Sequence, residues 1–162
     1  MTERERTITW QDPAPATAAG LAMPGIDYMQ AILKGELPAS PIAQTLQFEL
    51  VEVAPGRAVF TCTPDESVYN PIGVVHGGLV CTLLDSAAGC ALHTTLPQGK
   101  GYTSVEIKVS YLKAVRSTSG LLTATGTVVK SGSRVGFTEA TVTDGSGALV
   151  ATATSTLLVF DL

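Results

Sequence analysis

The chain has little charge, few cysteines and few histidines, and each shortage excludes a class of function. Only 15% of its 162 residues are charged and the formal net charge is −4, so it has no basic field that would hold a nucleic acid. Cys62, Cys81 and Cys90 are an odd set without paired spacing, which indicates neither a disulfide framework nor a zinc site. Because His76 and His93 are the only histidines and no cysteine is spaced to join them, we expect no metal and no cofactor.

Long apolar runs are missing as well. The longest are too short to cross a bilayer, and the first residues, Thr2–Arg6, are charged rather than an apolar signal core. We therefore expect a cytoplasmic protein that makes no contact with a membrane. Internal repeats and low-complexity tracts are also absent from the sequence, and its length suits one main domain.

The composition divides the chain into three parts. Residues 1–20 mix charges, prolines and an Ala/Thr stretch, and we expect a flexible N-terminal lead. Residues 21–40 have the weak periodicity of a short helix that ends near Gly35 and Pro38. Residues 41–162 are expected to form the main domain.

Within the main domain the pattern predicts a hairpin, one long helix and four more strands. The hairpin covers residues 48–63 around a Pro55–Gly56 turn, and the helix covers residues 76–92. Short turns between the later strands predict antiparallel neighbours, in a sheet that curls around the apolar helix. The fold class is therefore α+β, with about five to six antiparallel strands. The four later strands are expected at Tyr102–Leu112, Leu121–Val129, Val135–Val142 and Leu149–Phe160.

The predicted helix carries a carboxylate in an unusual place. At about 100° per residue its apolar side chains cover most of the circumference, which is typical of a buried helix. Asp85 lies in the narrow polar strip that remains, too far from the start of the helix to be its N-cap. A carboxylate there needs a hydrogen-bond partner or a chemical role, and we favour a functional group over a structural one.

The loop before this helix, Asn70–Gly78, ends in two consecutive glycines. Glycine allows a ligand to approach the backbone, and the first N–H groups of a helix have no acceptor within it. Such donors suit a developing oxyanion. The alternative is that Gly77 and Gly78 only form a tight turn capped by His76.

Helix geometry adds a prediction about assembly. With a rise of about 1.5 Å per residue, Gly77 and Asp85 lie about 12 Å apart on one helix, too far to act on one carbonyl group. Two antiparallel copies of the helix, related by a twofold axis, would bring Gly77 of one chain close to Asp85 of the other. If the two residues share a site, the protein is a homodimer with two equivalent sites.

Asn70, the His76-Gly77-Gly78 step and Asp85, in this order and spacing, resemble the signature of the hotdog-fold acyl-CoA thioesterases, in particular the phenylacetate-degradation type. The resemblance covers roughly residues 40 to 160. It implies a long helix wrapped by a curved antiparallel sheet, a homodimer that often pairs into a homotetramer, and a small-molecule acyl-CoA substrate.

The resemblance also implies a role for each residue. Asp85 would act as general base toward water or as nucleophile on the thioester. The Gly77 N–H would polarise the thioester carbonyl, and Asn70 would position the water or the carbonyl. His76 would orient the loop.

Five further residues are expected to contact the substrate. Ser104 or Thr103 would assist the carboxylate, and strand register decides which of them faces it. Gly78 and Leu79 would line the site, and Arg134 would contact the nucleotide end of coenzyme A.

The expected reaction is hydrolysis of an acyl-CoA or aryl-CoA thioester to a free acid and coenzyme A. One alternative is a hotdog protein that binds acyl-CoA without turnover. Another is a hotdog dehydratase or hydratase, although the His-Phe-Pro-Gly type segment of those relatives is missing. A Ser-His-Asp triad is disfavoured because the chain has no Gly-x-Ser-x-Gly elbow.

Overall fold

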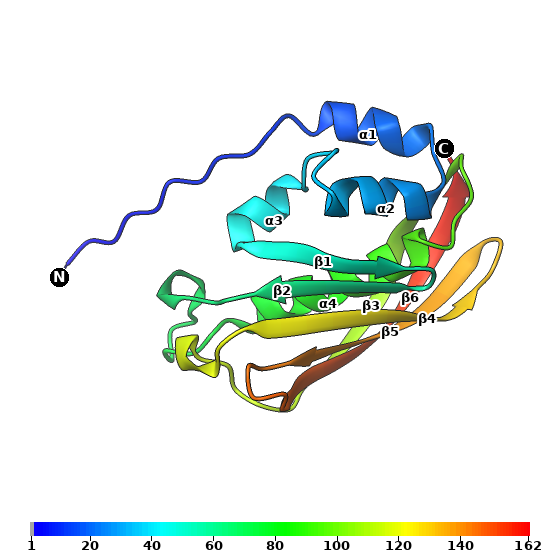
Figure 1. Cartoon of the computed structure of the whole chain (residues 1–162). Coiled ribbons are helices and arrows are strands. Elements are labelled where there is room, and N and C mark those ends of the chain that lie inside the picture. The colour runs from blue at the N-terminus through cyan, green and yellow to red at the C-terminus, as the bar shows by residue number, and fades with distance from the viewer. Residues whose placement is uncertain (1) are drawn as a thin grey trace.

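The computed structural model describes residues 2–162. Its six strands form one antiparallel sheet in the order β1-β2-β4-β5-β6-β3, which curves around the long helix α4 (Figure 1). The α+β architecture predicted from the sequence, a long helix against a curved antiparallel sheet, is confirmed. The strands are β1 (Phe48–Ala54), β2 (Arg57–Cys62), β3 (Lys100–Tyr111), β4 (Leu122–Ser131), β5 (Val135–Thr143) and β6 (Leu149–Asp161).

Helix α4 (Gly77–His93) forms the centre of the core. Its small side chains let the sheet come close: at Gly126 on β4, a Cβ atom would lie 2.1 Å from the carbonyl oxygen of Ala87, so only glycine fits there. The apolar circumference seen in the sequence is buried as predicted. The buried residues of α4 are Leu79, Val80, Leu83, Leu84, Ala87, Ala88, Gly89, Ala91 and Leu92.

One prediction about the sheet is wrong. The short turns in the sequence predicted that β3 and β4 would be neighbours. Instead, β3 pairs with β6 over residues 100–111 and lies at the edge of the sheet. The link of residues 112–121, which includes the short 3₁₀ helix η2 (Ser117–Ser119), is long enough to carry the chain from this edge to the middle of the sheet. The free edges are therefore β1 and β3.

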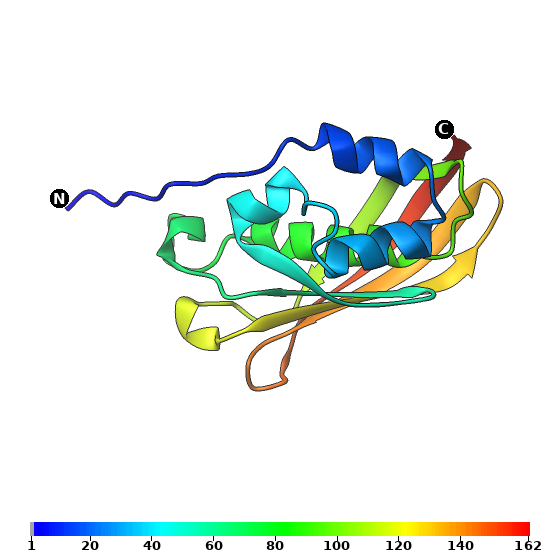
Figure 2. The same cartoon turned by 45° about the horizontal axis from the view of Figure 1, so that its top comes forward.

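Three helices precede the sheet: α1 (Ala14–Leu21), α2 (Gly25–Leu33) and α3 (Pro41–Leu46). Figure 2 shows them gathered at the β1 side of the sheet, where α2 contacts both β1 and α4. The helical segment expected within residues 21–40 corresponds to α2, whereas α3 was not predicted.

Residues 1–20 were expected to form a flexible lead, and the described part of this segment contains a helix and several polar contacts. Its second half contains α1, where Pro13 precedes an alanine-rich stretch and the Asp12 side chain accepts a hydrogen bond from the Ala14 N–H. Its first half is attached to the domain by Arg6, whose guanidinium donates to the Gln47 side chain and to the Thr45 carbonyl, each at 2.9 Å. This N-terminal segment buries little apolar surface, and local capping and polar contacts hold it in place.

Candidate active site

The carboxylate of Asp85 has a partner on the neighbouring strand. Asp85 is partly buried in the third turn of α4, and the Ser104 hydroxyl on β3 donates to its Oδ1 at 2.8 Å. Thr103 is the residue before Ser104 on an extended strand, so its side chain faces the opposite side of the sheet. The structure thus places Ser104, and not Thr103, against the carboxylate.

The loop that leads into α4 is held by its own polar groups. The side-chain carbonyl of Asn70 accepts from the N–H groups of Ile72 at 3.1 Å and Val74 at 3.3 Å. Gly73 has a φ of 77°, which a glycine adopts without strain. Because the Asn70 oxygen is used within the loop, the NH₂ group is the part of this side chain that is available to a ligand.

His76 is the N-cap of α4. Its Nδ1 accepts from the Gly78 N–H at 2.8 Å, which agrees with a role in orienting the loop and with the capping alternative. Among residues 2–162 the Gly77 N–H has no acceptor. The first turn of α4 therefore presents a backbone donor at the positive end of the helix dipole.

Tyr111, at the end of β3, fixes the backbone beside this donor. Its hydroxyl donates to the Gly77 carbonyl at 3.0 Å, and a Cβ atom at Gly77 would lie 3.2 Å from its ring. Sequence reasoning did not assign Tyr111 to the site, because the contact joins residues 34 apart along the chain and depends on where β3 ends.

The expected site residues form two groups that stay apart within one chain. Asp85 lies in the middle of α4, with Ser104 beside it. The second group, at the N-terminus of the helix, consists of Asn70, His76 and Gly77. The eight residues from Gly77 to Asp85 correspond to about 12 Å of helix. The structure thus retains the separation from which the sequence analysis predicted a second chain.

The other expected substrate contacts lie in different surroundings. Gly78 is exposed at the start of α4, and Leu79 is only 4% exposed within the core. Arg134 lies in the turn between β4 and β5, two residues before Gly136, which packs on Leu92 near the C-terminal end of α4. Arg134 is exposed and forms no ion pair with the described residues, so its guanidinium is available to an anion.

Burial keeps two of the three cysteine thiols in the protonated form. All three cysteines are free, and burial raises the pKa of Cys62 to about 11 and that of Cys90 to about 12. These thiols stay protonated at neutral pH, and the thiolate is the reactive form. Within residues 2–162 no group of three His, Cys, Asp or Glu side chains is arranged to hold a metal ion, and no helix is long and apolar enough to span a membrane.

Comparisons with known proteins point to one family. Residues 72–151 match the family model of the thioesterase superfamily. Acyl-coenzyme A thioesterase 13 from Homo sapiens is 29% identical over 125 residues, which cover 76% of this chain and 88% of that protein.

Two solved structures resemble this chain over most of their own length. A phenylacetic acid degradation-related protein from Ralstonia eutropha is 27% identical with a TM-score of 0.73, and the match covers 81% of this chain and 98% of that one. A Streptococcus mutans protein solved with acetyl-CoA bound is 27% identical with a TM-score of 0.65, covering 70% and 89% of the two chains.

Proposed function

We propose that this chain, a hotdog-fold member of the thioesterase superfamily and a thioester hydrolase, cleaves acyl-CoA or aryl-CoA thioesters to a free acid and coenzyme A. The observation that carries the proposal is the Asp85 carboxylate on the largely apolar helix α4, which accepts a hydrogen bond from Ser104 on β3. The acetyl-CoA bound to the Streptococcus mutans relative supports a coenzyme A thioester as the substrate.

In the proposed mechanism Asp85 activates the attack on the thioester carbonyl. Ser104 donates to Oδ1, and no hydrogen bond from residues 2–162 reaches Oδ2, which is left for the reaction. As general base, Oδ2 takes a proton from water while the water oxygen adds to the carbonyl carbon; as nucleophile, it adds to that carbon itself and water later releases the acid. In both routes the C–S bond breaks and the coenzyme A thiolate, a good leaving group, takes up a proton.

The donor for the developing oxyanion would come from a second copy of the chain. Gly77 and Asp85 of one chain lie too far apart to meet on one carbonyl, whereas a twofold axis beside α4 would join Gly77 and Asn70 of one copy to Asp85 and Ser104 of the other. The free edge of β3, with Thr103–Glu106 exposed, supports pairing with a second copy. We propose two equivalent sites per homodimer.

Two further features of the surface support finer parts of the proposal. The free guanidinium of Arg134 would contact phosphates of coenzyme A. The outer face of the sheet exposes Phe137 and Leu158, 44% and 42% exposed, and this apolar surface supports a dimer of dimers. The cytoplasmic location expected from the sequence stays a prediction.

The test is release of coenzyme A thiol from a panel of short, medium, long-chain and aromatic CoA thioesters. Asp85→Asn should lower kcat about 100-fold or more, because it removes the base or nucleophile, while binding of the thioester is retained. Asp27→Asn, the same change on the exposed face of α2, is the control and should keep wild-type turnover. Saturable binding of thioesters by the wild type without turnover of any of them would contradict hydrolysis and favour the acyl-CoA-binding alternative.

A further inference from the structure

We propose that the acyl group of the substrate is held in a cavity inside each chain, between α2 and α4, and that α2 thereby selects uncharged acyl groups of medium size. This inference rests on the proposed function and adds to it the class of substrate and the element that selects it.

The cavity lies next to the core, between the N-terminal helices and the sheet. Its volume is about 380 Å³, within the range of sites that bind small molecules. Most of its walls are apolar: Met29 on α2, Ala43 on α3, Phe48 on β1 and Phe60 on β2. A cavity of this kind favours an apolar occupant.

Tyr102 forms the wall between this cavity and the Asp85 site. Tyr102 lines the cavity, and on β3 it precedes Ser104 by two residues, so both side chains lie on the face of the strand that meets α4. Its ring packs on Gly89, where a Cβ atom would lie only 2.7 Å away, and Gly89 is one helical turn beyond Asp85. The Tyr102 wall of the cavity therefore lies within one turn of α4 from Asp85.

The lining carries no net charge at neutral pH. Tyr28, His93 and Tyr102 form a row of rings with centroids 5.3 Å and 5.4 Å apart. Burial lowers the pKa of His93, which favours the neutral imidazole, and mainly burial raises the pKa of Tyr102. None of the residues that line the cavity is Asp, Glu, Lys or Arg. An acyl group that carries a free carboxylate would find no cation there, and the carboxylate would lose its hydration.

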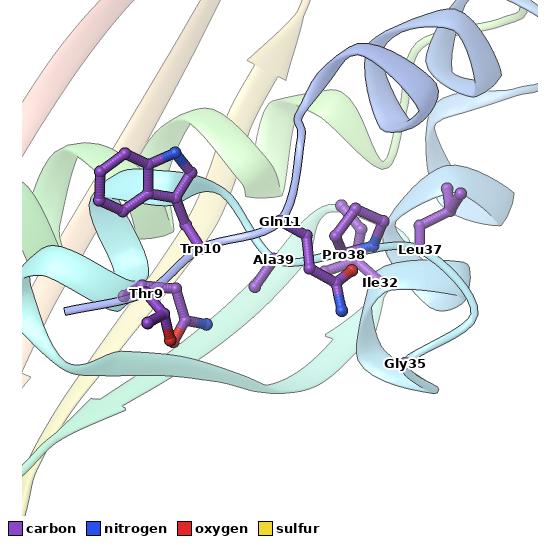
Figure 3. Close-up of a pocket in the computed structure, with 9 residues that line it drawn as sticks. Thr9, Trp10, Gln11, Ile32, Gly35, Leu37, Pro38 and Ala39 are labelled. Carbon is purple, nitrogen blue, oxygen red and sulfur yellow. The ribbon is translucent and has the colours of Figure 1, made fainter.

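The length of the cavity is limited by the chain around α2. The N-terminus of α2 is fixed on the end of α4, because the Gly25 N–H donates to the Leu96 carbonyl at 3.0 Å and Gly25 has no room for a side chain beside His93. At the far end, Ile32 and Ala39 line both the cavity and a surface hollow that Figure 3 shows beside Trp10. A short acyl group would leave the cavity partly empty, and a long one would meet this wall.

The test compares kcat/KM for acyl-CoA thioesters from acetyl to palmitoyl, and for succinyl-CoA, in the wild type and three variants. The wild type should prefer medium-length acyl groups and discriminate at least about tenfold against succinyl-CoA. Ala43→Leu fills the cavity and should lower kcat/KM for octanoyl-CoA about tenfold or more, with little change for acetyl-CoA. Met29→Ala enlarges the cavity and should move the optimum to longer chains, so the test does not depend on one variant folding. Ala18→Leu, on the exposed side of α1, is the matched control and should leave the profile unchanged.

The outcomes separate the inference from the proposed function. If the wild type turns over thioesters but folded Ala43→Leu and Met29→Ala keep its chain-length profile, the cavity does not hold the acyl group. Efficient turnover of succinyl-CoA would also overturn the inference while supporting hydrolysis. If the wild type turns over no thioester, the proposed function fails and the inference fails with it.

Discussion

Ser104 and Thr103 are neighbouring hydroxyl residues on β3, and only Ser104 contacts the Asp85 carboxylate. Ser104→Ala removes the donor to Asp85 Oδ1 and should lower kcat about tenfold to a hundredfold, because hydrogen bonds to charged groups contribute about 1.5–3 kcal/mol. Thr103→Val removes a hydroxyl on the opposite face and should leave kcat within about twofold of the wild type. Release of coenzyme A thiol measures both. An equal loss in the two variants would contradict the assigned orientation of β3.

Individual residues differ in how well the sequence predicts them. Asp85 stands out because a carboxylate within a buried apolar helix is uncommon, and His76 and Gly77 stand out because a Gly-Gly step opens that helix. Thr103 and Ser104 could not be separated, since one residue of register inverts the face of a strand. Tyr102 and Tyr111 were not assigned to the site because their contacts with α4 arise only when β3 is placed beside it.

At the scale of elements, the end of α4 beneath α2 should make stability depend on pH. Burial lowers the pKa of His93 in the folded chain, while unfolded His93 binds a proton near pH 6.5. As the pH falls below about 6.5 the unfolded state takes up the proton first, so the free energy of unfolding decreases. His93→Gln should reduce this decrease between pH 7 and pH 5. Urea unfolding at a series of pH values checks it, and an unchanged slope in the variant would show that His93 is not the group responsible.

The sequence predicted the strands and the long helix well, but not every element or the strand order. All six strands and α4 begin and end within two residues of the expected positions, because period-2 and period-3.6 patterns are strong in this chain. The place of β3 was missed because short-turn rules describe neighbours in sequence, whereas the link of residues 112–121 crosses to another strand. Helices α1 and α3 were missed because each is short and has little apolar periodicity.

For the whole molecule, the central claim is that a complete site needs two chains. Gly77 and Asp85 are too far apart on one rigid helix to act on the same carbonyl group, so the sequence alone predicts a second chain. The structure keeps the two groups apart. Asn70 offers a way to test the other half of the site. Asn70→Asp retains the oxygen that accepts from Ile72 and Val74 and removes the NH₂ group, so the loop should fold while the site is impaired.

The most direct measurement is the activity of mixed dimers of Asp85→Asn and Asn70→Asp subunits, formed by dissociating and reassociating the two impaired variants. A hybrid dimer would have one site in which both residues are intact and one in which both are changed. With random pairing of equal amounts, half of the dimers are hybrids, so the mixture should recover about a quarter of the wild-type rate of coenzyme A release. If hybrid dimers form, as native mass spectrometry can show, and no activity returns above that of the separate variants, the site is not shared between chains.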